Sequence, residues 1–207
     1  MKLKVCGMRD SKNIEQLLAL KPDYMGFIFY GKSPRDVEGI LDENLLSSFP
    51  ESTKKVGVFV NASLQEVKEK VARFGLDYVQ LHGDESVEYV ADLFAVGIKV
   101  MKVFSIGESF DFAEVGQYNP YVDFFLFDTK GKSRGGNGEV FDWEILNEYD
   151  QKTPFFLSGG IDLENVDALK GLEGMNIHAV DVNSKFELAA GMKDIERIKK
   201  LTSSLRE

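Results

Sequence analysis

The sequence predicts a single α/β domain, a (β/α)8 TIM barrel that spans residues 1–207. Short β-branched or aromatic runs alternate with segments of helical period along the whole chain. No low-complexity linker or change of composition divides it. A run followed by a helical segment occurs eight times, which is the number in a closed barrel. The competing architecture, an open doubly wound sheet, would use about five or six strands, so the continuous alternation favours the barrel.

Eight runs are strand candidates, and several of them are almost continuously apolar. Parallel strands that are covered on both faces have this composition. The runs are KLKVCGM (2–8), YMGFIF (24–29), KKVGVFV (54–60), YVQLHG (78–83), IKVMKVF (98–104), FFLFDT (124–129), PFFLSGG (154–160) and HAVDVNS (178–184).

The segments between these runs carry apolar residues at helical spacing. Ser63 and Glu66 form a capping box at the start of one helix, and Asp84 is expected to cap the next one. The apolar face of that next helix is predicted to be Val87, Val90, Ala91 and Phe94. The remaining helices are indicated by Ile14, Leu17 and Leu18, by FDWEILNEY (141–149), by a start near Leu163, by Ile195, Ile198 and Leu201, and most weakly by residues 42–49 and 109–117.

The composition limits the kinds of partner. The residues are 43% apolar and 29% charged, as in globular proteins with a sizeable core. The net charge of −9 argues against nucleic acid or an anionic membrane as the main partner. The single cysteine cannot form an internal disulfide. No apolar run approaches the ~20 residues of a membrane span, and MKLKVCGMRD lacks the apolar stretch of a secretory signal. We therefore expect a cytoplasmic protein that binds a small molecule.

Reactive side chains stand at the ends of the predicted strands. In a barrel these ends converge on one mouth, although they are far apart in the sequence. A thiol, an imidazole and two carboxylates at one mouth would form a catalytic cup. These groups are supplied by Cys6, His82, Asp128 and Asp181.

Each of these residues also has an ordinary structural interpretation. Cys6 could be a small buried apolar residue, His82 a surface histidine, and Asp128 the terminator of its strand. A buried carboxylate at position 128 would have a raised pKa, which suits a general acid. A Cys–His–Asp metal site lacks the tight ligand spacing of CxxC or HxxxH, so we expect no metal.

Two loops bear on the ligand. In LSGGID (157–162), Gly159 and Gly160 let the backbone approach an oxyanion at the start of a helix. Asn183 and Ser184 end the eighth strand, and barrel enzymes often bind phosphate after strands seven and eight. An ordinary tight turn is the alternative interpretation of the glycine pair.

A long polar segment and one arginine complete the candidate mouth. TKGKSRGGNGEVFDW (129–143) contains Gly135, Gly136 and Gly138 and is predicted to be a lid, with a merely flexible loop as the alternative. Arg35 follows the second strand, where it could bind a carboxylate or remain a solvated surface charge.

Six motifs, in order along nearly the full chain, resemble the phosphoribosylanthranilate isomerase family of tryptophan biosynthesis. This family is a (β/α)8 barrel, in agreement with the strand count. The resemblance implies an aldose–ketose isomerase that works without a cofactor. Its reaction is the Amadori rearrangement of N-(5-phosphoribosyl)anthranilate to 1-(2-carboxyphenylamino)-1-deoxyribulose 5-phosphate. The motifs are KVCGMR, SPR, QLHGDE, FDT…RGGNGEVFDW, LSGGID…NV and VDVNS…KD.

The resemblance also implies roles for single residues. Asp128 would protonate the ring oxygen and open the sugar to a Schiff base, and Cys6 would remove the C2′ proton as a thiolate. Such a base must be half-ionised near neutral pH, which a thiol can be when a polar site lowers its pKa. Arg35 would pair with the anthranilate carboxylate. His82 and Asp181 would line the mouth, and the phosphate would lie on backbone N–H groups around Gly159, Gly160, Asn183 and Ser184.

One departure from the family and two alternatives remain. After strand eight the family usually reads Ser-Ser-Gly-Val-Glu, whereas this chain has NSKFE (183–187), so Lys185 stands where a glycine is usual. The first alternative is an isomerase or epimerase of a different phosphosugar. It would bind phosphate in the same way but differ at the aromatic end of the substrate, so Arg35 distinguishes it from this family. A catalytically silent binding barrel would have no reason to keep Cys6 and Asp128. The sequence leaves a monomer and a homodimer equally open.

Overall fold

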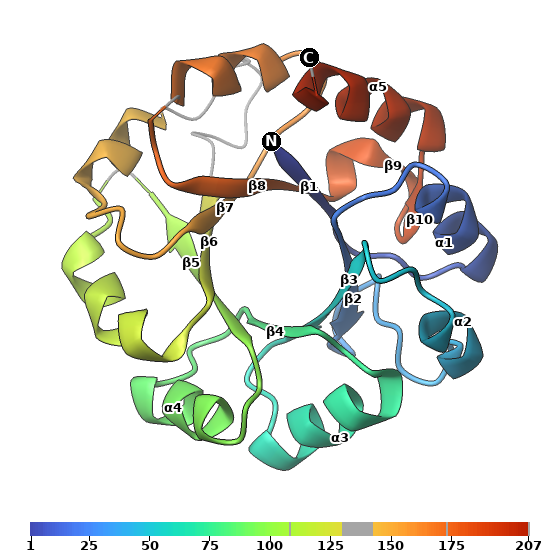
Figure 1. The fold of residues 1–207 in the computed structure, drawn as a ribbon, viewed down its shortest axis with the longest axis horizontal. Helices are drawn as coiled ribbons and strands as arrows, with labels where there is room; N and C mark the ends of the chain where they lie inside the picture. Colours follow the sequence, from blue (N-terminus) through green and yellow to red (C-terminus); the bar gives the residue numbers. More distant parts are fainter. Residues whose placement is uncertain (108, 130–142, 173, 207) are drawn as a thin grey trace.

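The computed structural model describes residues 1–107, 109–129, 143–172 and 174–206. Its eight main strands form a closed barrel in the order β1 to β8. β1 pairs in parallel with both β2 and β8, which closes the sheet. Viewed down the barrel in Figure 1, the strands form an inner ring and the helical segments an outer one. The predicted (β/α)8 fold is therefore confirmed, and the open sheet is excluded.

The strands lie close to their predicted positions, but the first, fourth, seventh and eighth end two or three residues before the predicted runs do. The left-handed φ of +75° at Gly7 and +99° at Gly159 turns the chain away from the sheet after β1 and β7. The barrel strands are β1 (Lys2–Val5), β2 (Tyr24–Phe29), β3 (Lys54–Phe59), β4 (Tyr78–Leu81), β5 (Val100–Ile106), β6 (Phe124–Thr129), β7 (Phe155–Ser158) and β8 (Ile177–Val182).

Four α-helices follow the first four strands, and a fifth ends the described chain. The capping box is confirmed on its Ser63 side, because the hydroxyl of this residue accepts a 3.2 Å hydrogen bond from the Glu66 N–H. The helices are α1 (Ser11–Leu18), α2 (Glu43–Ser47), α3 (Leu64–Phe74), α4 (Val87–Ala95) and α5 (Ile195–Arg206).

The predicted cap of α4 is wrong, and its predicted apolar face holds at Val90 but not at Phe94. Ser86, not Asp84, caps this helix and accepts a hydrogen bond from the Tyr89 N–H at 3.3 Å. The helix starts late because the buried Glu85 carboxylate accepts from the Gly83 N–H and turns the chain there. As a result Leu93 is buried in place of Phe94, which is 51% exposed.

Three connections on the other side of the barrel contain 3-10 helices. They are η1 (Phe112–Tyr121), η2 (Trp143–Glu148) and η3 (Val166–Leu172). The seventh helix was expected near Leu163, and the Asp162 side chain accepts from the N–H groups of Glu164 and Asn165 at 2.8 and 3.2 Å. This is the hydrogen-bond pattern of an N-cap, but the 3-10 helix itself begins only at Val166.

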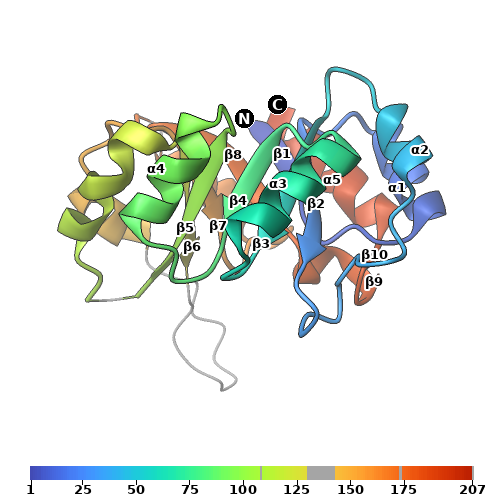
Figure 2. The ribbon, with the colours of Figure 1, turned by 90° about the horizontal axis from the view of Figure 1, so that it is seen from below.

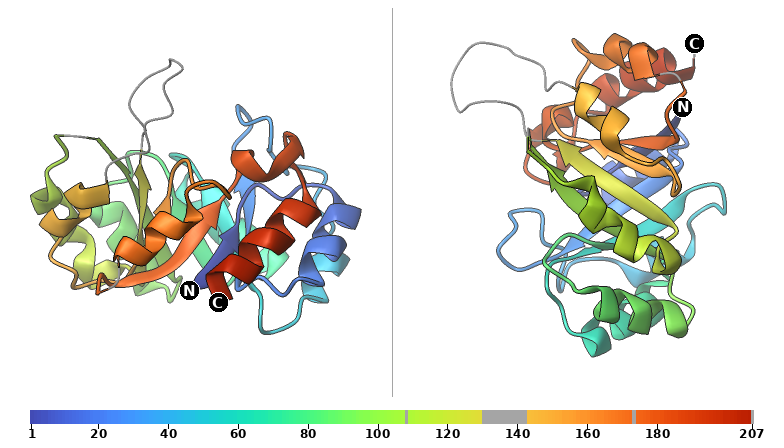
Figure 3. Two further views of the ribbon diagram at one scale, coloured as in Figure 1. Left: turned by 90° about the horizontal axis from the view of Figure 1, so that it is seen from above. Right: turned by 90° about the vertical axis from the view of Figure 1, so that its left-hand side faces the viewer.

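An unpredicted insertion separates β8 from α5. It consists of the short 3-10 helix η4 (Ser184–Phe186) and the antiparallel strands β9 (Glu187–Ala189) and β10 (Met192–Lys193). Figure 2 shows β9 and β10 at the face to which the barrel strands point, opposite the face that carries both termini. The termini meet there, where the Met1 amino group donates to the Leu205 carbonyl at 3.1 Å, and they lie side by side in Figure 3 as well.

The apolar core has an inner and an outer part. The outer part packs the strands against the helices. The inner part fills the barrel below the mouth with Tyr24, Val56, Met101, Val103, Phe124, Leu126, Phe156 and Ala179. Among the described residues, no helix has the length and apolar character needed to cross a membrane.

Candidate active site

A cavity of about 390 Å³ opens at the carboxyl ends of the barrel strands. Most of the predicted site residues line it, so the structure brings together side chains from the ends of β1, β4, β6, β7 and β8. These residues are Cys6, His82, Asp128, Gly159, Gly160, Asp181, Asn183 and Ser184. Arg35 is absent from this lining.

Cys6 is 4% exposed, and its thiol fits because of Gly26 on the neighbouring strand. A Cβ on Gly26 would lie 2.7 Å from the Cys6 sulfur, which is far inside van der Waals contact. Gly7, which follows the thiol, makes room in the same way for the side chains of Arg35 and Asn183. The two glycines therefore allow the crowded surroundings of Cys6.

Lys4 is the charged neighbour of this thiol. Lys4 and Cys6 lie two residues apart at the end of β1, so both point into the barrel. The Lys4 ammonium is fully buried and donates to Asp181 Oδ1 at 2.8 Å, and its charge acts on the Cys6 thiol. Burial lowers the pKa of Lys4, but Asp181 and Cys6 outweigh this effect, and the pKa lies above its usual value. Lys4 is therefore a fixed cation next to the sulfur.

The pKa of Cys6 differs from the sequence-based expectation. A lowered pKa was expected, whereas burial raises the pKa of this thiol, and Lys4 and Lys193 offset the effect only in part. The reason is that the surroundings of Cys6 are dry as well as charged.

Asp128 and His82 face each other across the cavity mouth. Asp128 Oδ2 lies 3.8 Å from His82 Nε2, and the two side chains are 29% and 38% exposed. Burial lowers the pKa of His82, and Lys4 and Lys102 lower it further, so the imidazole is neutral at pH 7. Asp128 is thus half-buried beside a neutral partner, rather than enclosed in an apolar pocket.

The two predicted loops form one wall of the cavity. Gly159 and Gly160 have left-handed φ values of +99° and +68°, and a Cβ on Gly159 would lie 2.1 Å from the Thr129 carbonyl oxygen. Lys185, at the position of the family's glycine, lines the same cavity. It lies within η4 and has no left-handed φ, so this position does not need a glycine.

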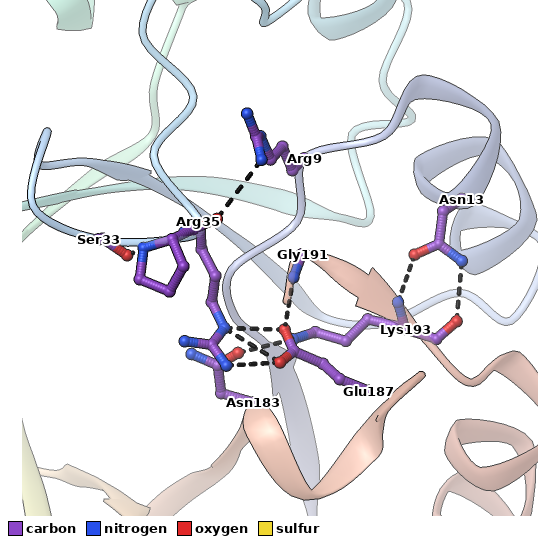
Figure 4. Close-up of polar contacts among 9 residues, drawn as sticks. Arg9, Asn13, Ser33, Arg35, Asn183, Glu187, Gly191 and Lys193 are labelled. Carbon is purple, nitrogen blue, oxygen red and sulfur yellow. Dashed lines mark hydrogen bonds and ion pairs between the residues drawn. The ribbon is translucent and has the colours of Figure 1, made fainter. Parts of the chain in front are cut away.

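Arg35 stands beside the cavity and binds an acid of the protein itself (Figure 4). Its Nε lies 2.9 Å and its Nη2 2.5 Å from the two carboxylate oxygens of Glu187. The Glu187 carboxylate also accepts from Lys193 Nζ at 2.6 Å, and these hydrogen bonds keep its pKa at about 2 in spite of burial.

Four side chains around the cavity were not singled out from the sequence: Lys4, Gln80, Glu187 and Lys193. Gln80 is 2% exposed, lines the cavity, and its Oε1 has no hydrogen-bond partner among the described residues. Lys4 had a detectable signal, since it lies two residues before Cys6 in a strand. Glu187 lies 152 residues from Arg35, and no local pattern indicates their pairing.

Two further expectations concern the predicted lid and a metal site. The predicted lid glycines Gly135, Gly136 and Gly138 lie outside the described residues. Within the described ranges, no group of three or more His, Cys, Asp and Glu side chains is arranged to hold a metal ion.

Comparison with known proteins identifies the family. The family model of N-(5′-phosphoribosyl)anthranilate isomerase matches residues 3–204. The chain belongs to this family. Like the other members, it is an isomerase of the aldose–ketose type in tryptophan biosynthesis.

Individual relatives agree with this assignment. The chain is 44% identical over 200 residues to N-(5′-phosphoribosyl)anthranilate isomerase of Parabacteroides distasonis, covering 96% of this chain and 90% of that protein. It is 39% identical to the isomerase of Phocaeicola vulgatus, with 100% and 98% covered. The crystal structure of the Thermotoga maritima enzyme superposes with a TM-score of 0.86 at 28% identity, covering 100% of this chain and 98% of that one.

A further similar structure holds a ligand. It is a phosphoribosylanthranilate isomerase in complex with reduced 1-(o-carboxyphenylamino)-1-deoxyribulose 5-phosphate. Its TM-score to this chain is 0.84 at 27% identity, with 100% of this chain and 98% of that chain covered.

Proposed function

We propose that residues 1–207 form one catalytic domain, in which Asp128 is the acid and Cys6 the base of the family's Amadori rearrangement. The observation that supports this most directly is that both side chains line one cavity, although Cys6 follows β1 and Asp128 lies on β6. The reaction needs one group to open the sugar and another to move a carbon-bound proton. This cavity contains one candidate for each task.

The first step opens the furanose ring. Protonated Asp128 donates its proton to the ring oxygen while the bond between that oxygen and C1′ breaks. The lone pair of the anthranilate nitrogen forms a C1′=N double bond, which gives a protonated Schiff base. Because the Asp128 side chain is 29% exposed, it can regain a proton from water after the step.

The second step moves a proton from carbon. The Cys6 thiolate takes the C2′ proton, and the released electron pair forms the C1′=C2′ bond and neutralises the nitrogen. The resulting enolamine gains a proton at C1′ and loses its hydroxyl proton, which leaves the C2′ ketone with no net change in atoms. The buried Lys4 ammonium stabilises the thiolate that this step requires.

The two ends of the substrate are assigned to different walls. Arg35 binds the anthranilate carboxylate, while the backbone N–H groups around Gly159, Gly160, Asn183 and Ser184 hold the phosphate. The two glycines and the conformation of η4 support the phosphate assignment, since they leave the backbone accessible from the cavity. His82 and Asp181 line the mouth between these ends.

We also propose that the enzyme acts in the cytoplasm as a monomer or homodimer on a small-molecule substrate. The net charge of −9 and the single cysteine support this setting, and one similar structure is a set of monomers generated from the dimeric Thermotoga maritima enzyme. Sedimentation velocity separates the two oligomeric states, and a larger assembly would contradict both.

Genetic complementation followed by kinetics tests the proposed function. We expect the chain to restore growth without tryptophan in a bacterium that lacks this isomerase, and the purified protein to turn over N-(5-phosphoribosyl)anthranilate. A folded protein that fails in both experiments would overturn the proposal. Turnover of a different aminoaldose phosphate alone would favour the other phosphosugar isomerase.

A further inference from the structure

The guanidinium of Arg35 is fixed by its own anion. Its Nε donates to the Glu187 carboxylate oxygens at 2.9 and 3.1 Å, and Nη2 donates to one of them at 2.5 Å. This is a side-on bidentate pair, which restricts rotation of the planar group. The Glu187 side chain is only 4% exposed, so the pair is shielded from solvent on that side.

Glu187 is held from behind by a second cation. Lys193 Nζ donates to Glu187 Oε1 at 2.6 Å and to Asn183 Oδ1 at 2.6 Å. The backbone of Lys193 is anchored in turn, because its N–H and carbonyl both hydrogen-bond the side chain of Asn13 in α1. Figure 4 shows this continuous arrangement from Asn13 through Lys193 and Glu187 to Arg35.

The remaining amino group of Arg35 is left for a ligand. No hydrogen bond within the described residues engages its Nη1, and in Figure 4 this group points away from Glu187. The position that a Cβ of Gly7 would take lies 2.7 Å from both Arg35 Cδ and Asn183 Oδ1. Asn183 lines the cavity, so the Arg35 side chain lies beside a residue of the cavity wall.

The net charge of Arg35, Lys193 and Glu187 favours the binding of one anionic group. Arg35 and Lys193 are positive and Glu187 is negative, since its pKa is about 2. One positive charge is left over, and its exposed portion is on Arg35, because Lys193 is 1% exposed. A monovalent carboxylate at the Nη1–Nη2 edge would balance it without breaking the pair with Glu187.

We infer that Glu187 is a positioning residue for substrate recognition, which orients Arg35 so that its free edge receives the aryl carboxylate. This inference rests on the proposed function, because it assumes that Arg35 meets that carboxylate. Lys193 supports the arrangement by holding Glu187.

Two ligands that differ by one group provide the test. One is the reduced product analogue, and the other is the same analogue made from aniline, which lacks the carboxylate. The dissociation constant of the aniline-derived ligand divided by that of the full analogue measures carboxylate recognition in each variant. We expect Arg35→Ala to lower this ratio by about 10- to 100-fold and Glu187→Gln to lower it by about 10-fold, while the aniline-derived ligand binds nearly as before. Glu43→Gln, which removes a similar but exposed partner of Arg73 at 2.7 Å, should leave both constants unchanged.

The outcomes separate the inference from the function on which it rests. If Arg35→Ala leaves the ratio unchanged, the role of Arg35 in the proposed function is wrong, and the inference with it. If Arg35→Ala lowers the ratio but Glu187→Gln weakens both ligands equally, Glu187 is only structural and the inference alone fails. Should Glu187→Gln not fold, the charge-balanced Glu187→Gln/Lys193→Met double variant replaces it, with the same expected ratio and the same contradicting result.

Discussion

At the residue scale, the surroundings of Cys6 set both its space and its ionisation. Gly26 gives the thiol room, and Lys4 gives it a cation within the barrel. Neither feature depends on a long motif, because each comes from a neighbouring position on β1 or β2. Substitutions at these two positions should therefore affect catalysis by different physical routes.

Gly26→Ala should displace the thiol. The new Cβ would lie 2.7 Å from the Cys6 sulfur and 3.1 Å from its Cα, so we expect a loss of about 1–3 kcal/mol of stability from overpacking and at least a 10-fold fall in kcat. Thermal unfolding and steady-state kinetics measure both. Gly31→Ala is the matched control, since a Cβ there has no neighbour within 4 Å. An unchanged kcat in Gly26→Ala would show that the thiol position does not matter.

Lys4→Met should raise the pKa of Cys6 further. A raised thiol pKa moves formation of the thiolate to higher pH, and removal of Lys4 deletes a group that lowers this pKa, while Asp181, which raises it, remains. Because Cys6 is the only cysteine, its alkylation rate by iodoacetamide reports the thiolate fraction across pH. We expect the midpoint to lie above that of an ordinary thiol in the wild type and to move higher in Lys4→Met. The exposed Lys2→Met serves as control, and a midpoint that stays or falls in Lys4→Met contradicts this account.

At the element scale, the loop after β7 makes two glycines unequal. Gly159 and Gly160 both have left-handed φ values, but a Cβ on Gly159 would lie 2.1 Å from the Thr129 carbonyl oxygen, whereas a Cβ on Gly160 meets nothing within 4 Å. The first position therefore carries a steric constraint in addition to the conformational one.

Alanine substitutions should separate these effects. Gly160→Ala is expected to cost about 1–2 kcal/mol of stability from its left-handed conformation and to leave the inhibition constant of inorganic phosphate within a few fold. Gly159→Ala must move the loop away from β6, so it should cost more stability and weaken phosphate inhibition by at least 10-fold. Denaturant unfolding and competitive inhibition measure the two quantities. Equal effects of the two variants would refute the distinction.

The sequence indicated the strands better than their connections. Runs such as FFLFDT are apolar because helices cover the outer face of each strand and the packed barrel interior covers the other, so their bounds could be predicted closely. The described parts of the connections after β5, β6 and β7 contain 3-10 helices in place of helices of the predicted α-helical period. The insertion of β9 and β10 carries no period long enough to recognise.

At the scale of the whole molecule, closure of the barrel assembles the site. The pairing of β1 with β8 places Lys4 opposite Asp181, and the parallel order places the remaining strand ends around the same cavity. For this reason the grouping of Cys6, His82 and Asp128 could be predicted from strand ends alone. The partners that set their properties could not, because ion pairs such as Arg35–Glu187 join distant segments whose side chains give no local signal.

The central claim is that Cys6 and Asp128 divide the chemistry between them, and turnover of two variants tests it most directly. Cys6→Ala has no base, and Asp128→Asn keeps the shape of the side chain but cannot give up a proton. We predict that kcat of each variant falls by about 10²–10⁴-fold. Each variant should still bind the reduced product analogue, because neither side chain is assigned to the phosphate or the carboxylate. Near-wild-type turnover of N-(5-phosphoribosyl)anthranilate by either variant would contradict the account. For Cys6→Ala this result would mean that Cys6 is only a small buried apolar residue.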